Sequence, residues 1–289
     1  MAAPLFNRQK VILDLISRAP RRPAKLQLVK WLFLAGEETG IRDEVPFYDF
    51  VPYQYGPFSF TAYRELARLQ ERGLVDEELR VQEGEREVAE GLVDALGDPV
   101  RQVVTDVLAE YGRLRSKDLL DYVYSTYPWF ASRSRLRPPG QVTKAPLAVY
   151  TAGYEGESID HFLNRLLQGG IERLIDVRRN PYSRKYGFSG GPLRRTCRKL
   201  RIEYRHLPGL GIPSKLRRDI ETRRKRDRLF RHYENEMLPL REQDLDAAAK
   251  MVGSKPSALM CVEHDVDDCH RGPLSRAVAR LSGLKTIHL

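Results

Sequence analysis

Hydrophobic residues in the first part of the chain recur every three or four positions, the spacing of one face of an α-helix. In residues 4–18, Val11, Ile12 and Leu15 share such a face, and Pro20 ends the segment. The same spacing returns in four later segments before residue 130. The pattern predicts helices over residues 4–18, 24–38, 59–72, 99–111 and 116–127.

Between the second and third of these helices the pattern is strand-like. Residues 47–52 are short and aromatic, and a Gly-Pro turn follows them. Ser59 or Thr61 can cap the third helix. Residues 74–82 then predict a β-wing. Helix, helix, turn, helix and hairpin is the order of a winged helix, so we expect a mainly α, winged-helix-like domain over residues 1–132.

After a Pro/Gly/basic linker at residues 133–145, apolar segments alternate with amphipathic ones. Strands are predicted over residues 147–151, 173–177, 202–207, 258–262 and 284–288. Helices are predicted over residues 159–167, 193–200, 215–237, 244–252 and 273–281. Such alternation is typical of a mostly parallel sheet with helices on both faces. We therefore expect an α/β domain over residues 146–289.

Charge is concentrated in one part of this second domain. The chain has a net charge of +10, and residues 178–231 hold 19 Lys or Arg but four Asp or Glu, a net charge of +15. A basic block of this kind attracts phosphates and releases their counterions. We expect a nucleic-acid partner, with DNA favoured over RNA, and no membrane partner because the block has no apolar face.

The composition limits the cellular locations and the cofactors that we expect for this protein. No apolar run is long enough to cross a bilayer, and residues 1–10 lack the features of a signal peptide. Three cysteines do not form a disulfide framework, so a reducing cytoplasm is the expected location. No cofactor is expected, and no Walker loop or nuclease metal motif is present.

Titratable side chains follow almost every predicted strand of the second domain. Because ligands of open parallel sheets bind outside the carboxyl ends of the strands, these residues should converge. They are Tyr154, Glu155, Asp176, Arg178, Arg179, His206, Cys261, Glu263, His264, Asp268, Cys269, His270 and Arg271. Asp176 and Glu263 are the candidate general acid and base. The alternative for Asp176 is to cap the following turn.

Two cysteines belong to this set. Cys269 precedes His270 and Arg271 at a helix N-terminus, which lowers a thiol pKa and favours a nucleophilic or redox-active thiolate. Cys261 ends an apolar strand, so a buried and inert thiol is an equally good interpretation of this residue. Both cysteines with His270 and Glu263 could instead bind zinc, but the spacing is not that of a standard zinc knuckle. We therefore assign no metal and take Asp176, Glu263, Cys269 and His270 as the catalytic candidates.

The remaining candidates would contact nucleic acid. Arginines suit phosphate because of their fork geometry, and aromatic rings interleaved with them can stack on bases. The alternatives are ion pairs to the nearby carboxylates and packing within the loop. The predicted nucleic-acid-binding residues are Tyr154, Arg178, Arg179, Tyr182, Arg184, Lys185, Phe188 and Arg271.

Four stretches in the first half resemble the Panacea antitoxin-type domain. They are Lys25-Leu26-Gln27, residues 50–59, Arg72-Gly73-Leu74-Val75 and residues 119–128. The resemblance covers roughly the first 130 residues. It implies a module similar to winged helices, associated with toxin neutralisation and transcription. Such a module binds a protein or DNA and carries no active site.

Motifs of the second half resemble the domain-of-unknown-function 488 family over residues 147–289. They are Gly153-Tyr154-Glu155-Gly156, Asp176-Val177-Arg178, Asn180-Pro181, Ser183-Arg184, Phe188-Ser189, Leu210-Gly211-Ile212-Pro213 and Cys261-x-Glu263-x5-Cys269-His270-Arg271. The resemblance implies a compact α/β domain with a catalytic or ligand pocket. It also implies an association with nucleic-acid processing and repair.

Three functions are consistent with these observations. The first, which the sequence favours, is a base-excising hydrolase similar to a DNA glycosylase. An aromatic ring would stack on an extruded base, and Asp176 or Glu263 would orient water or stabilise a sugar cation. The second is a DNA-binding, thiol- or metal-dependent transcriptional regulator that uses Cys261 and Cys269. The third is an antitoxin-like protein whose N-terminal domain binds a protein partner.

Overall fold

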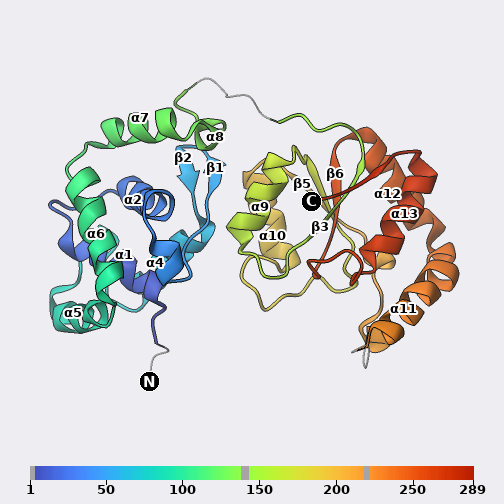
Figure 1. Ribbon diagram of the computed structural model, residues 1–289, viewed down its shortest axis with the longest axis horizontal. Coiled ribbons are helices and arrows are strands. Elements are labelled where there is room, and N and C mark those ends of the chain that lie inside the picture. The colour runs from blue at the N-terminus through green and yellow to red at the C-terminus, as the bar shows by residue number, and fades with distance from the viewer. Residues whose placement is uncertain (1–3, 138–142, 218–221) are drawn as a thin grey trace. The chain divides into compact units, whose positions relative to one another are not determined.

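The computed structural model describes residues 4–137, 143–217 and 222–289 of the chain (Figure 1). The chain divides into two compact units, residues 1–142 and residues 143–289. The predicted linker at residues 133–145 falls partly on residues 138–142, which lie outside the described residues. No helix in the described ranges has both the length and the apolar character needed to span a membrane.

The N-terminal unit is rich in helices packed around one apolar core. Its largest buried side chains include Trp31 and Phe33, and edge-to-face contacts join the Phe33 ring to Phe50 and Tyr127. All five predicted helices are present. The helices are α1 (Asn7–Arg18), α2 (Lys25–Glu38), α3 (Ile41–Glu44), α4 (Phe60–Glu71), α5 (Arg86–Asp94), α6 (Asp98–Tyr111), α7 (Ser116–Thr126) and α8 (Pro128–Ala131).

The two strands of this unit lie before α4 rather than after it. β1 (Val51–Tyr53) pairs antiparallel with β2 (Gly56–Phe58), and Ser59 caps α4 by accepting from the Ala62 amide. The wing predicted over residues 74–82 is reduced to one isolated bridge, between Val75 and Val81. This region is therefore a helical unit with a small hairpin, and the winged-helix assignment stays a prediction.

The C-terminal unit is built on a five-stranded parallel sheet. The strand order is β5-β4-β6-β3-β7, and every pairing is parallel. The strands are β3 (Val149–Gly153), β4 (Arg173–Asp176), β5 (Glu203–His206), β6 (Ser257–Cys261) and β7 (Thr286–His288). β3, β4 and β6 are fully buried, and β3 and β6 accordingly contain no charged residue. The α/β expectation is confirmed.

Helices cover both faces of this sheet. Figure 1 shows α9 (Ile159–Gln168) and α10 (Gly190–Lys199) on one side of it and α12 (Glu242–Ser254) and α13 (Arg271–Ser282) on the other. The connections explain this arrangement. The chain moves from β3 through β4 to β5 toward one edge and then returns to β6 and β7, so right-handed crossovers place the two pairs of helices on opposite faces.

The long helix predicted over residues 215–237 is wrong. The structure shows a short 3-10 turn at Ser214–Arg217, and residues 218–221 lie outside the described residues. Thr222 then caps α11 (Arg223–His232) by accepting from the Lys225 amide, and a π-helical turn, Tyr233–Met237, follows. The run of basic and apolar residues has one continuous helical pattern, so nothing in the sequence indicates the 3-10 turn or the π-helical turn.

Candidate functional site

The loop after β6 lies at the point where the sheet changes direction. The loops after β3 and β4 lead to α9 and α10 on one face, whereas the loop after β6 leads to α13 on the other. Since β6 lies between β3 and β4, the carboxyl end of β6 is flanked by chain segments that turn away from it. Ligands of open α/β sheets bind in the crevice at such a point. The predicted site residues do gather here, but they form two groups on opposite faces.

The first group is centred on Asp176, the last residue of β4. Its carboxylate is fully buried. Oδ1 accepts from Arg178 Nε at 2.8 Å, and Oδ2 accepts from an Arg178 guanidinium nitrogen at 2.6 Å and from the Tyr204 hydroxyl at 2.7 Å. Both oxygens are therefore engaged by the protein itself. Asp176 holds the loop after β4, and the structure corrects the expectation that it is a free general acid or base.

The rings of Tyr154 and Phe188 complete this first group. They stack on one another with centroids 4.1 Å apart and an interplanar angle of 11°, and both are buried. Arg178 donates to the Tyr154 hydroxyl and to the Phe188 carbonyl oxygen, both at 2.9 Å. The structure therefore corrects three predicted nucleic-acid contacts. The rings of Tyr154 and Phe188 pack against each other, and Arg178 forms an ion pair with Asp176. Packing within the loop and ion pairing are the two alternatives that the sequence left open.

Other predicted nucleic-acid contacts do face solvent. Tyr182 is 71% exposed, Arg179 and Arg184 are exposed, and Lys185 is half-buried over the Phe188 ring. The exposed side of α10 adds a second set of basic residues. These are Arg194, Arg195, Arg198 and Lys199. The surface formed by these exposed residues of the loop and of α10, here called the basic surface, carries cations and an aromatic ring suited to a polyanion.

The second group lies on the α13 face of the sheet. Cys261, the last residue of β6, packs with the apolar side chains beneath α12 and α13. Its Sγ lies 3.6 Å from His270 Nδ1 and 3.2 Å from Glu263 Oε2, and Cys269 Sγ lies 3.9 Å from the same His270 nitrogen. Both thiols and the imidazole are buried, and Glu263 is half-buried. We call Cys261, Glu263, Cys269 and His270 the thiol centre.

Backbone contacts place the thiol centre. The amides of Tyr154 and Glu155 donate to the Val262 carbonyl at 3.0 and 2.8 Å, so the loop after β3 clamps the end of β6. Gly153 permits this approach, because a Cβ added there would lie 1.8 Å from the Glu263 carbonyl oxygen. This close contact accounts for the glycine of the Gly-Tyr-Glu-Gly motif.

Arg271 has a structural role in the same loop. It is buried, and its guanidinium donates to the carbonyl oxygen of Glu263 and, at 2.5 Å, to that of His264. These contacts tie the start of α13 to the loop after β6, seven and eight residues earlier in the chain. The structure therefore corrects the prediction that Arg271 binds nucleic acid, because the side chain is buried and both terminal guanidinium nitrogens already donate to backbone carbonyls.

Protons are shared unequally within the thiol centre. A hydrogen bond from Cys269 and the neighbouring His270 lower the pKa of the Cys261 thiol well below its ordinary value. Burial and the adjacent Cys261 raise the pKa of Cys269. Burial opposes the charging of His270, but the negative charge of Cys261 outweighs it and raises the imidazole pKa. These directions favour the thiolate on Cys261, which has the closer cation and a donor, whereas the sequence predicts it on Cys269.

Two residues of the site, Tyr204 and Tyr233, were not foreseen. Tyr204 of β5 anchors Asp176. Tyr233 packs edge-on against the His270 ring at 5.5 Å and donates to the Leu210 carbonyl at 2.6 Å. His206, a predicted site residue, lies outside the thiol centre and contacts the Arg178 carbonyl at 2.9 Å. The apolar spacing within the basic segment was the available signal for Tyr233. The contacts of Tyr204 and His206 with Asp176 and Arg178, in contrast, join separate segments of the chain and can be seen only in the folded structure.

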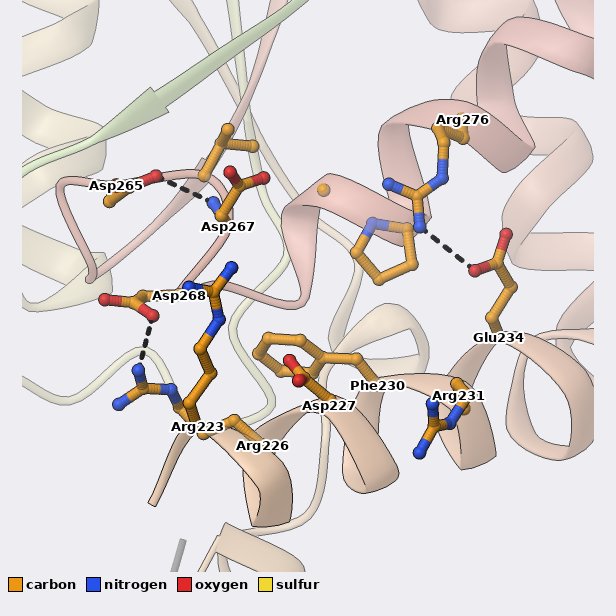
Figure 2. Close-up of a pocket in the computed structure, with 13 residues that line it drawn as sticks. Arg223, Arg226, Asp227, Phe230, Arg231, Glu234, Asp265, Asp267, Asp268 and Arg276 are labelled. Atoms are coloured by element: carbon orange, nitrogen blue, oxygen red, sulfur yellow. Dashed lines mark hydrogen bonds and ion pairs between the residues drawn. The ribbon is translucent and has the colours of Figure 1, made fainter. Parts of the chain in front are cut away.

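A cavity of about 680 Å³ lies between α11 and the loop that leads into α13, and no residue of the thiol centre lines it (Figure 2). Its lining combines arginines with acidic residues. Arg226 pairs with Asp268 at 2.7 Å, and Arg276 pairs with Glu234 at 3.0 Å. Part of the basic charge of α11 is therefore neutralised within the fold, which leaves the basic surface around α10 as the stronger attraction for phosphates.

Comparison with known proteins bears on this unit. Residues 158–278 match the model of the family described as domain of unknown function DUF488. The matched segment contains the thiol centre, Asp176 and the basic surface. No curated protein matches the chain, and neither does any solved structure. The Panacea-like resemblance of the N-terminal unit stays a prediction.

Proposed function

We propose that this protein is a nucleic-acid-binding regulator whose thiol centre controls the basic surface. One contact carries the proposal. His270 lies between the two thiols, and its Nε2 donates to the Val177 carbonyl oxygen at 3.3 Å. Val177 stands between Asp176 and Arg178, where the loop that presents Tyr182 and Arg184 begins. A change in the thiols therefore reaches that loop through a single imidazole ring.

The chemical change is oxidation of the two thiols. Both sulfurs are buried, so a small hydroperoxide is the suitable oxidant. The Cys261 thiolate attacks one oxygen of hydrogen peroxide, and the O–O bond breaks. Hydroxide is the leaving group, and Cys261 becomes a sulfenic acid. Cys269 then loses its proton and attacks the Cys261 sulfur, which forms a disulfide and releases water. Two thiols and one hydrogen peroxide thus give one disulfide and two waters.

Binding would rest on the basic surface. Exposed arginines and lysines neutralise phosphates and release counterions, and an exposed tyrosine can stack on an unpaired base. Tyr182 and Arg184 in the loop and Arg195 on α10 are the central side chains. Since α10 follows the same loop, a shift at Val177 would alter the spacing of these cations.

The experiment is a fluorescence-anisotropy titration of labelled DNA duplexes and single strands with the full chain. Reduced protein should bind with a Kd that rises steeply with salt, and peroxide should change that Kd. Cys269→Ser should abolish the response to peroxide. Cys197→Ser changes a buried cysteine in α10 and is the matched control, which should respond as wild type does. An unchanged Kd after the disulfide has formed would refute the regulatory role.

A base-excising hydrolase is the second candidate, and one observation favours it. Glu263 is half-buried at the switch point of the sheet, and burial together with Cys261 raises its pKa, as in a carboxyl that donates a proton. Oligonucleotides with normal, deaminated, oxidised and alkylated bases test this activity after alkali treatment. Cleavage at one modified base that is lost in Glu263→Gln would establish it. Binding without cleavage would leave the regulator.

A further inference from the structure

We propose that the thiol centre is a metal site for one borderline-soft divalent cation such as Zn²⁺. Cys261 Sγ, Cys269 Sγ and His270 Nδ1 are three of the ligands, and the Glu263 carboxylate is the fourth. Within the described residues, the three ligand atoms of the cysteines and the histidine all lie within 4.8 Å of one another. This inference deepens the proposed function, because it names the ligand that the thiol centre binds. It rests on the proposed function only where it concerns an effect of the metal on nucleic-acid binding.

The distances suit a tetrahedral ion. Zinc binds thiolate sulfur at about 2.3 Å and imidazole nitrogen at about 2.0–2.1 Å, which places these ligands roughly 3.5 Å apart in a tetrahedron. Cys261 Sγ and Cys269 Sγ lie 3.6 and 3.9 Å from His270 Nδ1. Glu263 Oε2 lies 3.2 Å from Cys261 Sγ and also interacts with Cys269. A metal ion can therefore enter between the two sulfurs and the imidazole with small side-chain adjustments, whereas the Glu263 carboxylate lies outside this group of three and must turn toward the ion to become the fourth ligand.

The surroundings orient the ligands. His270 Nε2 donates to the Val177 carbonyl at 3.3 Å, so Nδ1 is the nitrogen that faces the sulfurs and becomes a ligand when its proton is lost on metal binding. Metal-binding histidines commonly make such a bond through the second ring nitrogen. The Arg271 amide donates to Cys269 Sγ at 3.5 Å, a contact that stabilises a thiolate. Tyr233 packs against the imidazole ring and fixes its plane.

Burial supplies the energetic reason for a cation. The cluster lies in an apolar core under α12 and α13, where two thiols, an imidazole and a carboxyl cannot all be solvated. Buried charges are stable when they are paired or bind a metal. A divalent ion balances two thiolates, whose protons pass to solvent on binding. Thiolate and imidazole ligands favour zinc over magnesium or calcium, which prefer oxygen.

The fold also explains why the spacing in the sequence is unusual. Cys261 and Glu263 come from the end of β6, whereas Cys269 and His270 come from the start of α13. Arg271 holds these two segments together through the carbonyls of Glu263 and His264. The ligands are thus arranged by the crossover of a parallel sheet and not by a short zinc loop. A bound ion would link β6 to α13 and, through His270, to the loop after β4.

Cobalt titration of the reduced full-length protein tests the site, because Co²⁺ reports thiolate ligands by charge-transfer bands and tetrahedral geometry by its d–d bands. We expect one Co²⁺ per chain with both signals and complete displacement by one equivalent of Zn²⁺. Cys269→Ser should lose the stoichiometric site, and Cys197→Ser should keep it. Absence of a tetrahedral thiolate spectrum in wild type, or unchanged binding in Cys269→Ser, would overturn the proposal.

A second measurement uses only the wild-type chain, so it does not depend on how the variants fold. Zn²⁺ should slow alkylation of Cys261 and Cys269 without changing the rate at Cys197, as mapped by mass spectrometry of peptides. Equal rates with and without Zn²⁺ at all three cysteines would also overturn the proposal. Neither measurement involves nucleic acid, so a failure here leaves the test of nucleic-acid binding independent.

Discussion

His270 Nε2 donates to the carbonyl oxygen of Val177 at 3.3 Å, and this bond joins two groups that lie on opposite faces of the sheet. On one face Asp176 and Arg178 hold the loop that carries the basic surface. On the other face Cys261 and Cys269 share the Nδ1 side of the same imidazole. A change in the thiols is therefore one side chain away from the segment proposed to bind nucleic acid.

Asp176→Asn should destabilise the C-terminal unit by about 3–5 kcal/mol, because it leaves the buried Arg178 guanidinium without its charged partner. Urea unfolding followed by circular dichroism measures this change. Asp246→Asn, at an exposed position of α12, is the matched control and should change stability by less than about 0.5 kcal/mol. A stable Asp176→Asn protein that has lost only an activity would contradict the structural role.

Phe188 and Tyr182 lie in one loop and should respond in opposite ways. Phe188→Ala removes a fully buried ring and should cost about 3–5 kcal/mol of folding stability. Tyr182→Ala removes an exposed ring, should leave stability almost unchanged, and should weaken single-strand binding by about 1–3 kcal/mol. Thermal unfolding and anisotropy separate the two effects. Equal loss of stability in both variants would show that the loop packs differently.

Arg184→Ala should lower the slope of log Kd against log salt by about 1, because one phosphate contact is lost. Lys250→Ala on α12 is the control, since α12 and α10 cover opposite faces of the sheet. It should leave the slope unchanged. Equal slopes for all three proteins would place the nucleic-acid interface outside the basic surface.

The N-terminal unit should become more stable as pH rises from about 7 toward 9. Lys30 is buried, its Nζ donates to the Pro57 carbonyl at 2.8 Å, and burial lowers its pKa to about 7. Between this value and the ordinary value of 10.5 the unfolded lysine binds a proton that the folded one lacks, so stability increases with pH in this window.

Tryptophan fluorescence can follow this transition, because both tryptophans, Trp31 and Trp129, belong to the N-terminal unit. Lys30→Met should be more stable than wild type near pH 7, and the difference should shrink as pH rises. A difference that stays constant between pH 7 and 9 would contradict a neutral Lys30.

The parallel sheet and its helices could be predicted from the sequence because their patterns are local. Buried strands such as residues 258–262 read as apolar runs, and the helix at residues 159–167 has one clear apolar face. The reduction of the predicted wing to a single bridge could not be foreseen, because residues 74–82 are apolar enough for a hairpin. The π-helical turn after α11 has no local signature that distinguishes it from an α-helix.

The composition of the candidate site was foreseen better than its arrangement. Strand ends indicated which residues gather at the switch point, and the thiol centre and Asp176 do lie there. Side chains at the ends of neighbouring strands, however, point to either face of the sheet, so Asp176 and Cys261 are separated by it. The partners of Asp176, Tyr154 and Arg178 come from distant segments, and only the fold shows that they satisfy one another.

Hydrogen–deuterium exchange of the loop after β4 tests the central claim most directly. In the reduced protein the amides of Arg178, Ser183 and Gly190 are bonded to Asp176, Ser189 and Pro181, so their exchange should be slow. If the thiol centre controls this loop, peroxide should accelerate exchange across residues 178–190 in wild type and Cys197→Ser but not in Cys269→Ser. Unchanged exchange in wild type after the Cys261–Cys269 disulfide has formed would contradict the account.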